Sequence, residues 1–216
     1  MNIAIEQPAK LANQPRLSEH PDHEVVIVGA GISGLGIAIR LKEQGIESFI
    51  ILERADQVGG TWRDNRYPGI AVDITSFTYS YSFEQNPNWS RVFAPGSELQ
   101  NYTERVAAKY GIYPHIRFNV SVRRTEFDEQ DHYWRIETEG GDVITARHLV
   151  SATGGLISPK MSDIKGIGDF KGKIIHTGHW DESIELKGKR IAVIGTGATA
   201  VQLLPEIAPL AKRLDV

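Results

Sequence analysis

The sequence has 216 residues, of which 41% are hydrophobic and 24% are charged, and its formal net charge is −3. This is the composition of an ordinary globular chain, and its charge gives no electrostatic reason to expect binding to nucleic acid or to an anionic membrane surface. No apolar run reaches the ~18 residues that mark a membrane-spanning helix.

The N-terminal part predicts a short leader followed by a strand–helix–strand unit. Residues 1–22 are polar, contain three prolines and lack the apolar segment of a secretory signal, so we expect a flexible leader and a cytoplasmic protein. Residues 23–28 (HEVVIV) predict a buried strand, residues 32–43 an amphipathic helix and residues 48–52 (SFIIL) a second buried strand. Glycines occupy the first corner of this unit.

The middle of the chain is irregular before it becomes periodic again. Residues 55–95 are rich in Gly, Pro, Trp, Tyr and Asn, and a long irregular stretch inside a compact domain is usually functional. Residues 97–110 predict a helix with Ser97 as its N-cap. A small antiparallel β meander follows, with strands expected at residues 116–122, 132–137 and 142–150.

The last part of the chain repeats the strand–glycine–helix pattern. Residues 190–194 predict a buried strand, residues 199–207 a helix, and residues 214–216 the beginning of another strand. Because one strand and one helix cannot complete a nucleotide-binding domain, we expect the sequence to end within its second domain. The expected organisation is a leader, a first domain, a connection and the start of a second domain, at residues 1–22, 23–160, 161–188 and 189–216.

A glycine motif at the first corner predicts dinucleotide binding. The run from Gly29 to Gly34 (GAGISG) fits G-x-G-x-x-G, in which the first glycine permits a tight turn and Gly31 lets the backbone approach a pyrophosphate. Gly34 lets the helix pack closely on the strand. Glu53 ends the second strand, where a carboxylate accepts hydrogen bonds from ribose hydroxyls. The alternative for Glu53 is a solvated charge at a strand end.

The order of further glycine motifs favours FAD at this first turn. Gly59-Gly60-Thr61-Trp62 follows the strand–helix–strand unit, and Ser151-Ala152-Thr153-Gly154-Gly155 closes the meander. This order resembles the two-dinucleotide flavoproteins, in which a second turn, here Gly195-Thr196-Gly197-Ala198-Thr199-Ala200, holds a nicotinamide dinucleotide. A helix-capping turn without a ligand is the alternative for that second turn. The resemblance implies an α/β fold: an FAD-binding Rossmann-like domain with a small antiparallel meander, followed by the start of a Rossmann-like NADPH-binding domain.

The absence of cysteine separates two classes of flavoprotein. Disulfide reductases of this architecture use a cysteine pair, and these 216 residues contain none, so a dithiol relay within them is excluded. Residues 59–73 (GGTWRDNRYPGIAVD) and 170–181 (FKGKIIHTGHWD) instead resemble both fingerprints of the Baeyer–Villiger monooxygenases. Flavin-containing and N-hydroxylating monooxygenases share the architecture, but their second motif typically lacks the tryptophan found here at Trp180.

This resemblance implies the N-terminal part of an FAD- and NADPH-dependent monooxygenase. In such enzymes the reduced flavin adds dioxygen at its C4a carbon, and the resulting peroxide attacks a ketone carbonyl to give an ester or a lactone. Asp73, the candidate catalytic residue, is implied to lie beside the flavin and to orient an arginine from a later segment. His176 and Trp180 are implied to lie where the two domains meet, without a role in proton transfer.

The residues implied to bind cofactors fall into an FAD set and an NADPH set. The FAD set is Gly29, Gly31, Ser33, Gly34, Glu53, Gly60, Thr61, Trp62, Asp73, Tyr79 and Val122. The NADPH set is Gly195, Thr196, Gly197, Ala198 and Thr199. No histidine spacing predicts a metal site. The expected partners are a small-molecule substrate, with a ketone favoured, and dioxygen, without nucleic acid or a membrane span.

Some alternatives stay open at this stage. A sister flavin monooxygenase would act on nitrogen, sulfur or an alkyl chain, and a flavin-binding fragment would be inactive. Asp73 would in the simplest alternative cap a turn after Pro68 and Gly69. We expect these 216 residues by themselves to bind FAD weakly and not to turn over substrate.

Overall fold

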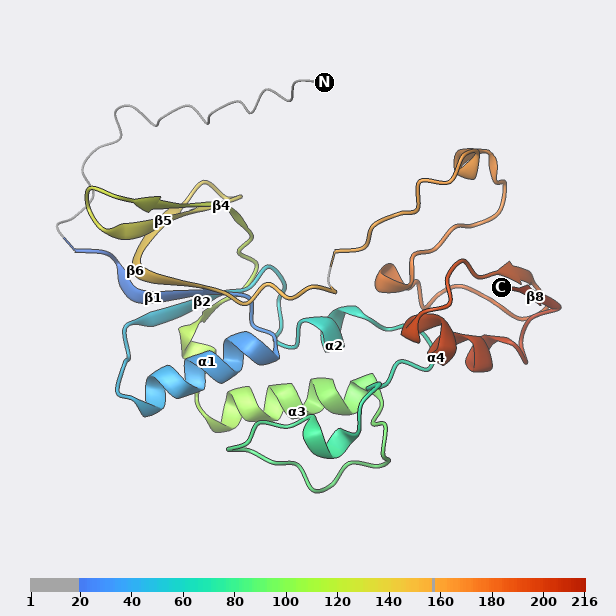
Figure 1. Cartoon of the computed structure of the whole chain (residues 1–216), viewed down its shortest axis with the longest axis horizontal. Helices are drawn as coiled ribbons and strands as arrows, with labels where there is room; N and C mark the ends of the chain where they lie inside the picture. The colour runs from blue at the N-terminus through green and yellow to red at the C-terminus, as the bar shows by residue number, and fades with distance from the viewer. Residues whose placement is uncertain (1–19, 157) are drawn as a thin grey trace.

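The computed structural model describes residues 20–156 and 158–216, which form two units joined by a long extended connection (Figure 1). The first unit contains a six-stranded sheet, and the second a two-stranded sheet. The predicted flexible leader, residues 1–22, lies outside the described residues as far as residue 19. Its last residue, Asp22, accepts hydrogen bonds from the backbone N–H and the hydroxyl of Thr145, each 2.8 Å long.

Half of the large sheet is parallel, as the strand–helix–strand pattern predicts. β1 (His23–Val28) lies between β2 (Phe49–Leu52) and β6 (Val143–Ser151) and runs parallel to both. β3 (Ile116–Arg117) extends this half beyond β2, again in parallel. β1 and β2 are short and mostly apolar, which suits strands that are covered on both faces.

The other half of the sheet is antiparallel, and β6 belongs to both halves. β5 (Tyr133–Thr138) pairs antiparallel with β6 and with β4 (Val122–Asp128), so the sheet order is β3-β2-β1-β6-β5-β4. Ala146 of β6 lies opposite Trp134 of β5, whereas Val150 lies beside Ile27 of β1. The meander is therefore continuous with the parallel strands.

The prediction of a single meander strand over residues 116–122 was wrong. Ile116 and Arg117 form β3 beside β2, and the first meander strand, β4, begins only at Val122. Asn119 lies in the break with φ of 59°. This left-handed conformation interrupts an extended strand and redirects the chain from one half of the sheet to the other.

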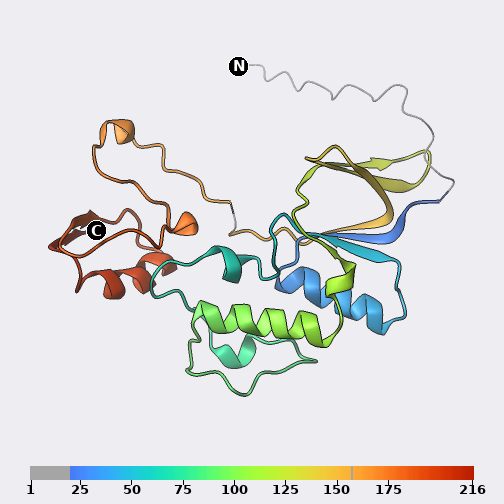
Figure 2. The same ribbon diagram turned by 180° about the vertical axis from the view of Figure 1, so that it is seen from behind.

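Helices α1 (Ile32–Glu43) and α3 (Gly96–Lys109) lie on the same side of the large sheet (Figures 1 and 2). The short α2 (Thr61–Asp64) follows the glycine pair. The prediction of Ser97 as an N-cap was wrong: Pro95 takes that position, because its backbone is extended and its carbonyl accepts the first bond of the helix, from the N–H of Glu98 at 3.0 Å. Single 3-10 turns occur at Ser76–Thr78, Tyr113–His115, Ile167–Asp169 and Thr177–His179.

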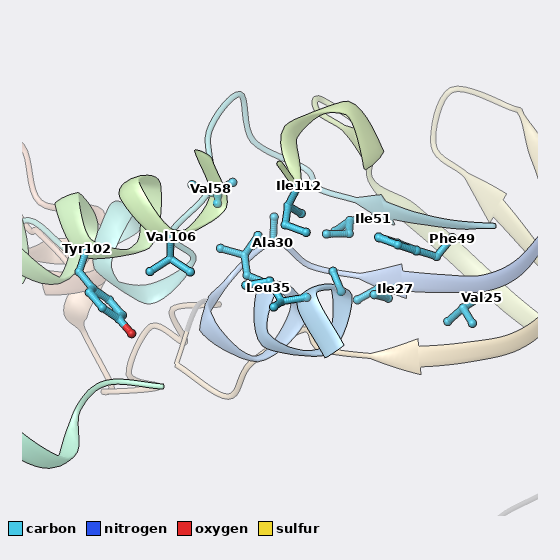
Figure 3. Close-up of a cluster of buried hydrophobic side chains, with 13 residues drawn as sticks. Val25, Ile27, Ala30, Leu35, Phe49, Ile51, Val58, Tyr102, Val106 and Ile112 are labelled. Atoms are coloured by element: carbon cyan, nitrogen blue, oxygen red, sulfur yellow. The ribbon is translucent and has the colours of Figure 1, made fainter. Parts of the chain in front are cut away.

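The main core fills the space between the parallel strands and these helices (Figure 3). Alternate residues of β1 and β2, such as Ile27 and Ile51, point into this cluster, where they meet Leu35 of α1 and Val106 of α3. The intervening residues, including Val26, pack on the opposite face in a second cluster with the meander strands. Burial on both faces fixes the register of β1, because a slip by one residue would exchange the two faces.

The second unit has the predicted strand–helix–strand order. β7 (Arg190–Ala192) pairs in parallel with β8 (Arg213–Asp215), and α4 (Ala198–Ile207) connects them. The strand predicted at residues 190–194 and the helix predicted at residues 199–207 are confirmed, with ends that differ by one or two positions. The prediction that this strand is buried was wrong: Arg190 and Ala192 are exposed, because the sheet of the second unit has only two strands among the described residues. Within the described parts of the chain, no helix is both long and apolar enough to cross a bilayer.

Truncation of a core side chain in β2 tests this packing. Ile51 is 0% exposed, so Ile51→Ala should lower the free energy of unfolding by about 2–5 kcal/mol through lost burial and a residual cavity. Urea denaturation measures the change. The matched control is Ile164→Ala, at a side chain that is 42% exposed, which should leave the unfolding midpoint nearly unchanged. Equal effects of the two substitutions would contradict the core described above.

Candidate functional site

A cavity of about 580 Å³ opens at the carboxyl ends of β1 and β2. Its walls come from the glycine turn after β1, the glycine pair after β2, the start of β4 and the segment after β6. Open α/β sheets bind ligands at this edge, and the volume lies within the range of roughly 300–1,000 Å³ that is typical of ligand sites. The sequence-distant glycine motifs therefore converge on one site.

Most of the predicted FAD set lies around this cavity. The predicted residues that line it are Gly29, Gly31, Ser33, Glu53, Gly60, Thr61, Trp62, Tyr79 and Val122. Gly34 and Asp73 do not line it, and neither does the predicted NADPH set, which lies in the second unit. Gly34 has a packing role, since a Cβ there would overlap the carbonyl oxygen of Gly29.

The cavity also has lining residues that the predicted set omitted. They are Arg54, Arg63, Val120, Ser121, Thr153, Gly154, Gly155 and Ser158, among others. The Ala152-Thr153-Gly154 run was visible in the sequence as the segment that closes the meander. Arg63 gave no such signal, because an arginine in an irregular stretch is usually a solvated surface residue.

The first glycine turn is shaped for an anion. Gly29 has φ of +106°, and a Cβ there would lie 2.5 Å from the carbonyl oxygen of Ala152. Gly31 is the N-cap of α1, and neither a side-chain cap nor an acidic residue occupies the first turn of that helix. The first amides of α1 therefore keep their donors for a ligand, and the helix dipole favours negative charge there.

The second glycine pair faces this turn at close range. A Cβ added to Gly31 would lie 3.7 Å from the Cα of Gly60, so the two backbones leave a slot that a larger residue would narrow. Gly60 itself has φ of +55° and precedes α2. A cradle of unsubstituted backbone with free helix N–H groups fits the diphosphate of a dinucleotide such as FAD.

Glu53 lies at the centre of this architecture and is buried, so the alternative of a solvated strand-end charge is wrong. Its Oε2 accepts from the backbone N–H of Ala30 at 2.7 Å, and its Oε1 accepts from the N–H of Ala55 at 3.0 Å. Oε1 also accepts from Nη1 of Arg63 at 3.1 Å. One carboxylate thus ties the glycine turn to α2 while it lines the cavity.

Arg63 extends this ion pair into a small network. Its Nε and Nη2 donate to the two oxygens of Asp64 at 2.7 and 3.0 Å, and Arg54 donates to the same carboxylate at 3.3 Å. Burial disfavours both charges, but Asp64 and Glu53 raise the pKa of Arg63, and Arg63 and Arg54 lower the pKa of Asp64. Mutual pairing therefore keeps these groups ionised beside the cavity.

Trp62 and Tyr79 form an aromatic wall of the cavity. The indole Nε1 of Trp62 donates to the hydroxyl of Tyr79 at 3.0 Å, and the rings meet edge to face with centroids 5.3 Å apart. Burial raises the pKa of Tyr79, the bond from Trp62 opposes this, and the carboxylate of Asp73 adds to the rise. Asp73 is exposed and does not line the cavity, yet its carboxylate acts electrostatically on Tyr79 in this wall.

The second glycine turn repeats the backbone of the first. Gly195 has φ of +120° where Gly29 has +106°, and the N-cap Gly197 has φ and ψ of −76° and −177° where Gly31 has −80° and −173°. No side-chain cap and no acidic residue occupy the first turn of α4. The second unit therefore offers the same kind of anion site as the first.

The two fingerprint segments, residues 59–73 and 170–181, meet on α4. Tyr67 of the first segment is buried against Leu203 and Ile207, and Trp180 of the second packs on the same apolar cluster. Within the second segment, Nδ1 of His176 accepts a hydrogen bond from the backbone N–H of Gly178 at 3.0 Å. This bond uses one ring nitrogen of His176 as the cap of a 3-10 turn.

Known proteins match this chain over nearly its whole length. A family model described as pyridine nucleotide-disulphide oxidoreductase matches residues 26–216. A Baeyer-Villiger monooxygenase of Streptomyces coelicolor is 46% identical over 206 residues, which cover 95% of this chain and 39% of that protein. The cyclohexanone 1,2-monooxygenase of an Acinetobacter species is 36% identical over 204 residues, which cover 93% of this chain and 38% of that protein.

Solved structures agree with these sequence matches. The crystal structure of OTEMO in complex with FAD and NADP matches this chain with a TM-score of 0.83 and 37% sequence identity. The matched region covers 90% of this chain and 38% of the OTEMO chain. The predicted α/β class is confirmed, and the described residues share the fold of a flavin monooxygenase. The chain spans about 39% of the length of the Baeyer-Villiger monooxygenases of Streptomyces coelicolor and Pseudomonas aeruginosa that it matches.

The buried ion pair at the cavity gives a testable prediction about stability. Glu53→Gln keeps the shape of the side chain but leaves buried Arg63 with one anionic partner fewer, and should lower the free energy of unfolding by about 3 kcal/mol. Chemical denaturation measures this loss. The matched control is Glu126→Gln, which breaks an exposed ion pair with Arg124 and should have almost no effect. A wild-type unfolding midpoint for Glu53→Gln would show that the pair does not brace the site.

Proposed function

The chain belongs to the pyridine nucleotide-disulphide oxidoreductase family, and on that premise we propose that it is the N-terminal part of an FAD- and NADPH-dependent Baeyer–Villiger monooxygenase. The reaction inserts one oxygen atom of dioxygen next to a ketone carbonyl. The observation that carries the proposal is the convergence of the glycine turn, the glycine pair and the Trp62–Tyr79 wall on one cavity. The family's cysteine chemistry is not available to these residues, because they contain no cysteine.

The first unit is proposed to bind FAD. The unpaired amides at the start of α1 would bind the diphosphate between Gly31 and Gly60, and Glu53 would hold the turn in shape beside the ribose. Val122, which lines the cavity from β4, would lie at the adenine end. When bound, FAD supplies hydride acceptance and oxygen activation, which no side chain of this chain provides.

The chain's own residues would orient the reacting end of the cofactor and limit the access of water. Trp62 and Tyr79 present a rigid wall, because each fixes the other through the indole–hydroxyl bond. Asp73 is the proposed catalytic residue. It is exposed, it follows buried Val72, and its carboxylate acts electrostatically on Tyr79. An exposed carboxylate in this position is available to orient a cationic side chain.

The second unit is proposed to bind NADPH. The turn from Gly195 to Thr199 reproduces the backbone of the FAD turn and leaves the first amides of α4 uncapped. The proposal thus assigns FAD to residues 23–160 and NADPH to the unit that begins at residue 189, with residues 161–188 as the connection. The proposed partners are a small ketone and dioxygen, and the proposed compartment is the cytoplasm, where NADPH is regenerated.

Substitution at the first turn tests the cofactor site directly. Gly31→Ala adds one methyl group into the slot opposite Gly60 without a severe clash, so the chain should fold but bind FAD at least tenfold more weakly. Equilibrium dialysis with FAD measures the change. Gly168→Ala, at a position with open space around it, is the control and should bind as the wild type does. Unchanged FAD affinity in Gly31→Ala would place the cofactor elsewhere.

Product analysis tests the reaction itself. The full-length protein, supplied with NADPH and ¹⁸O₂, should convert a ketone to an ester or lactone that carries one labelled oxygen atom, and Asp73→Ala should lower the rate at least a hundredfold. Mass spectrometry of the products of a ketone, an amine and a thioether decides between reaction classes. Oxygenation of only the amine or the thioether would favour a sister monooxygenase. NADPH oxidation without any oxygenated product would contradict the proposal.

A further inference from the structure

The side chain of Gln202, in α4, forms hydrogen bonds with the first fingerprint segment, residues 59–73. The Oε1 atom of Gln202 accepts a hydrogen bond from the hydroxyl of Tyr67 at 2.8 Å and lies 3.4 Å from the backbone nitrogen of Ala71, which also donates to it. Its Nε2 atom donates to the carbonyl oxygen of Ala71 at 2.9 Å. A single amide therefore satisfies both polar backbone groups of Ala71, as a neighbouring β-strand would.

The segment approaches the backbone of α4 as well as this side chain. Gly69 has φ of +81°, and a Cβ at that position would overlap the carbonyl oxygen of Gln202 and lie 2.9 Å from Cγ of Glu206. Only glycine permits this backbone together with this closeness. Tyr67, which is 8% exposed, closes the contact by packing on Leu203 and Ile207. The contact is thus a built interface between the two units.

Asp73 lies two residues after Ala71, whose backbone is hydrogen-bonded to Gln202. Between them, Val72 is 2% exposed, and its N–H donates to the carbonyl of Ala94 at 3.0 Å, so this part of the chain is anchored on both sides. Burial raises the pKa of Tyr67 at the α4 interface and of Tyr79 at the cavity wall, and the carboxylate of Asp73 adds to both rises. The carboxylate of Asp73 therefore lies within electrostatic range of both the cavity wall and the α4 interface.

We propose that Gln202 is a positioning residue that fixes residues 71–73 to the second nucleotide-binding unit, so that a displacement of that unit moves the carboxylate of Asp73 relative to the cavity. The same helix begins at the second glycine turn, and burial raises the pKa of Tyr67 while the side chain of Thr199 in the first turn of that helix lowers it. Occupation of the second nucleotide site is thereby coupled to the geometry beside the first. The functional part of this inference rests on the proposed roles of Asp73 and of the two turns.

Amide hydrogen exchange in this chain tests the hydrogen bonds of Gln202 to Tyr67 and Ala71 without any cofactor. Gln202→Leu keeps a side chain of similar size but removes the three hydrogen bonds between the Gln202 amide and Tyr67 or Ala71, so the amide of Ala71 and its neighbours within residues 70–73 should exchange at least tenfold faster. Protection of β1 and β2 should stay unchanged. The control is Val201→Ala, at a neighbouring α4 side chain that is 67% exposed, and it should exchange as the wild type does. Wild-type protection of residues 70–73 in Gln202→Leu would overturn the proposal.

A second variant covers the case in which Gln202→Leu disturbs the folding of α4. Gln202→Glu keeps an acceptor for Tyr67 and for the Ala71 N–H but cannot donate to the Ala71 carbonyl as an ionised side chain. It should therefore give an exchange rate between those of the wild type and Gln202→Leu. Exchange identical to the wild type in Gln202→Glu would show that the two bonds to the acceptor oxygen suffice and would overturn the role of the Gln202 Nε2 donor.

Flavin reduction in the full-length, FAD-loaded protein separates positioning from mere stability. In Gln202→Leu the rate of flavin reduction by NADPH, followed by absorbance, should fall at least tenfold, while the FAD content and the rate of reduction by dithionite match the wild type. A wild-type NADPH rate would limit Gln202 to a structural role and contradict the proposal. Failure of NADPH to reduce the wild-type flavin would instead refute the proposed function. The hydrogen-exchange result would still show whether Gln202 holds residues 71–73 in place.

Discussion

The buried carboxylate of Glu53 is the constraint on which the rest of the site depends. It accepts from the amide of Ala30 inside the first glycine turn and from the guanidinium of Arg63 on α2, so it holds two separate glycine motifs at a fixed spacing. A carboxylate buried at this depth is tolerated only because each oxygen has hydrogen-bond donors and a cation is adjacent. Without Glu53, the turn would lose a partner for an internal N–H, and Arg63 would lose a counter-ion.

The glycine turn of the second unit has the same backbone conformation as the first turn but makes fewer contacts with its surroundings. The backbone angles at Gly197 reproduce those at Gly31, although the third motif position is Ala200 in place of Gly34. At Gly34 a side chain would strike the turn itself, whereas Ala200 is accommodated in a buried position. The shape of the anion site is thus set by the first two glycines, and the third position reports how closely the helix packs on its strand.

Local patterns predicted the elements, and long-range contacts decided what the patterns could not. The apolar run of β1 and the periodicity of α1 were sufficient to predict both elements, because each is dictated by neighbours in the sequence. The break at Asn119 followed from pairing of Ile116 with β2, which no local signal contains. Likewise, the glycine motifs predicted most of the cavity lining, whereas Arg63 and Gln202 act through partners that only the folded chain brings near.

The decisive measurement is a crystal structure of the chain grown with saturating FAD. Our account predicts electron density for the diphosphate between the start of α1 and Gly60, with the isoalloxazine ring against Trp62 and the adenine near Val122. Density for the dinucleotide at any other position, or a first turn that stays empty at saturating FAD, would contradict it.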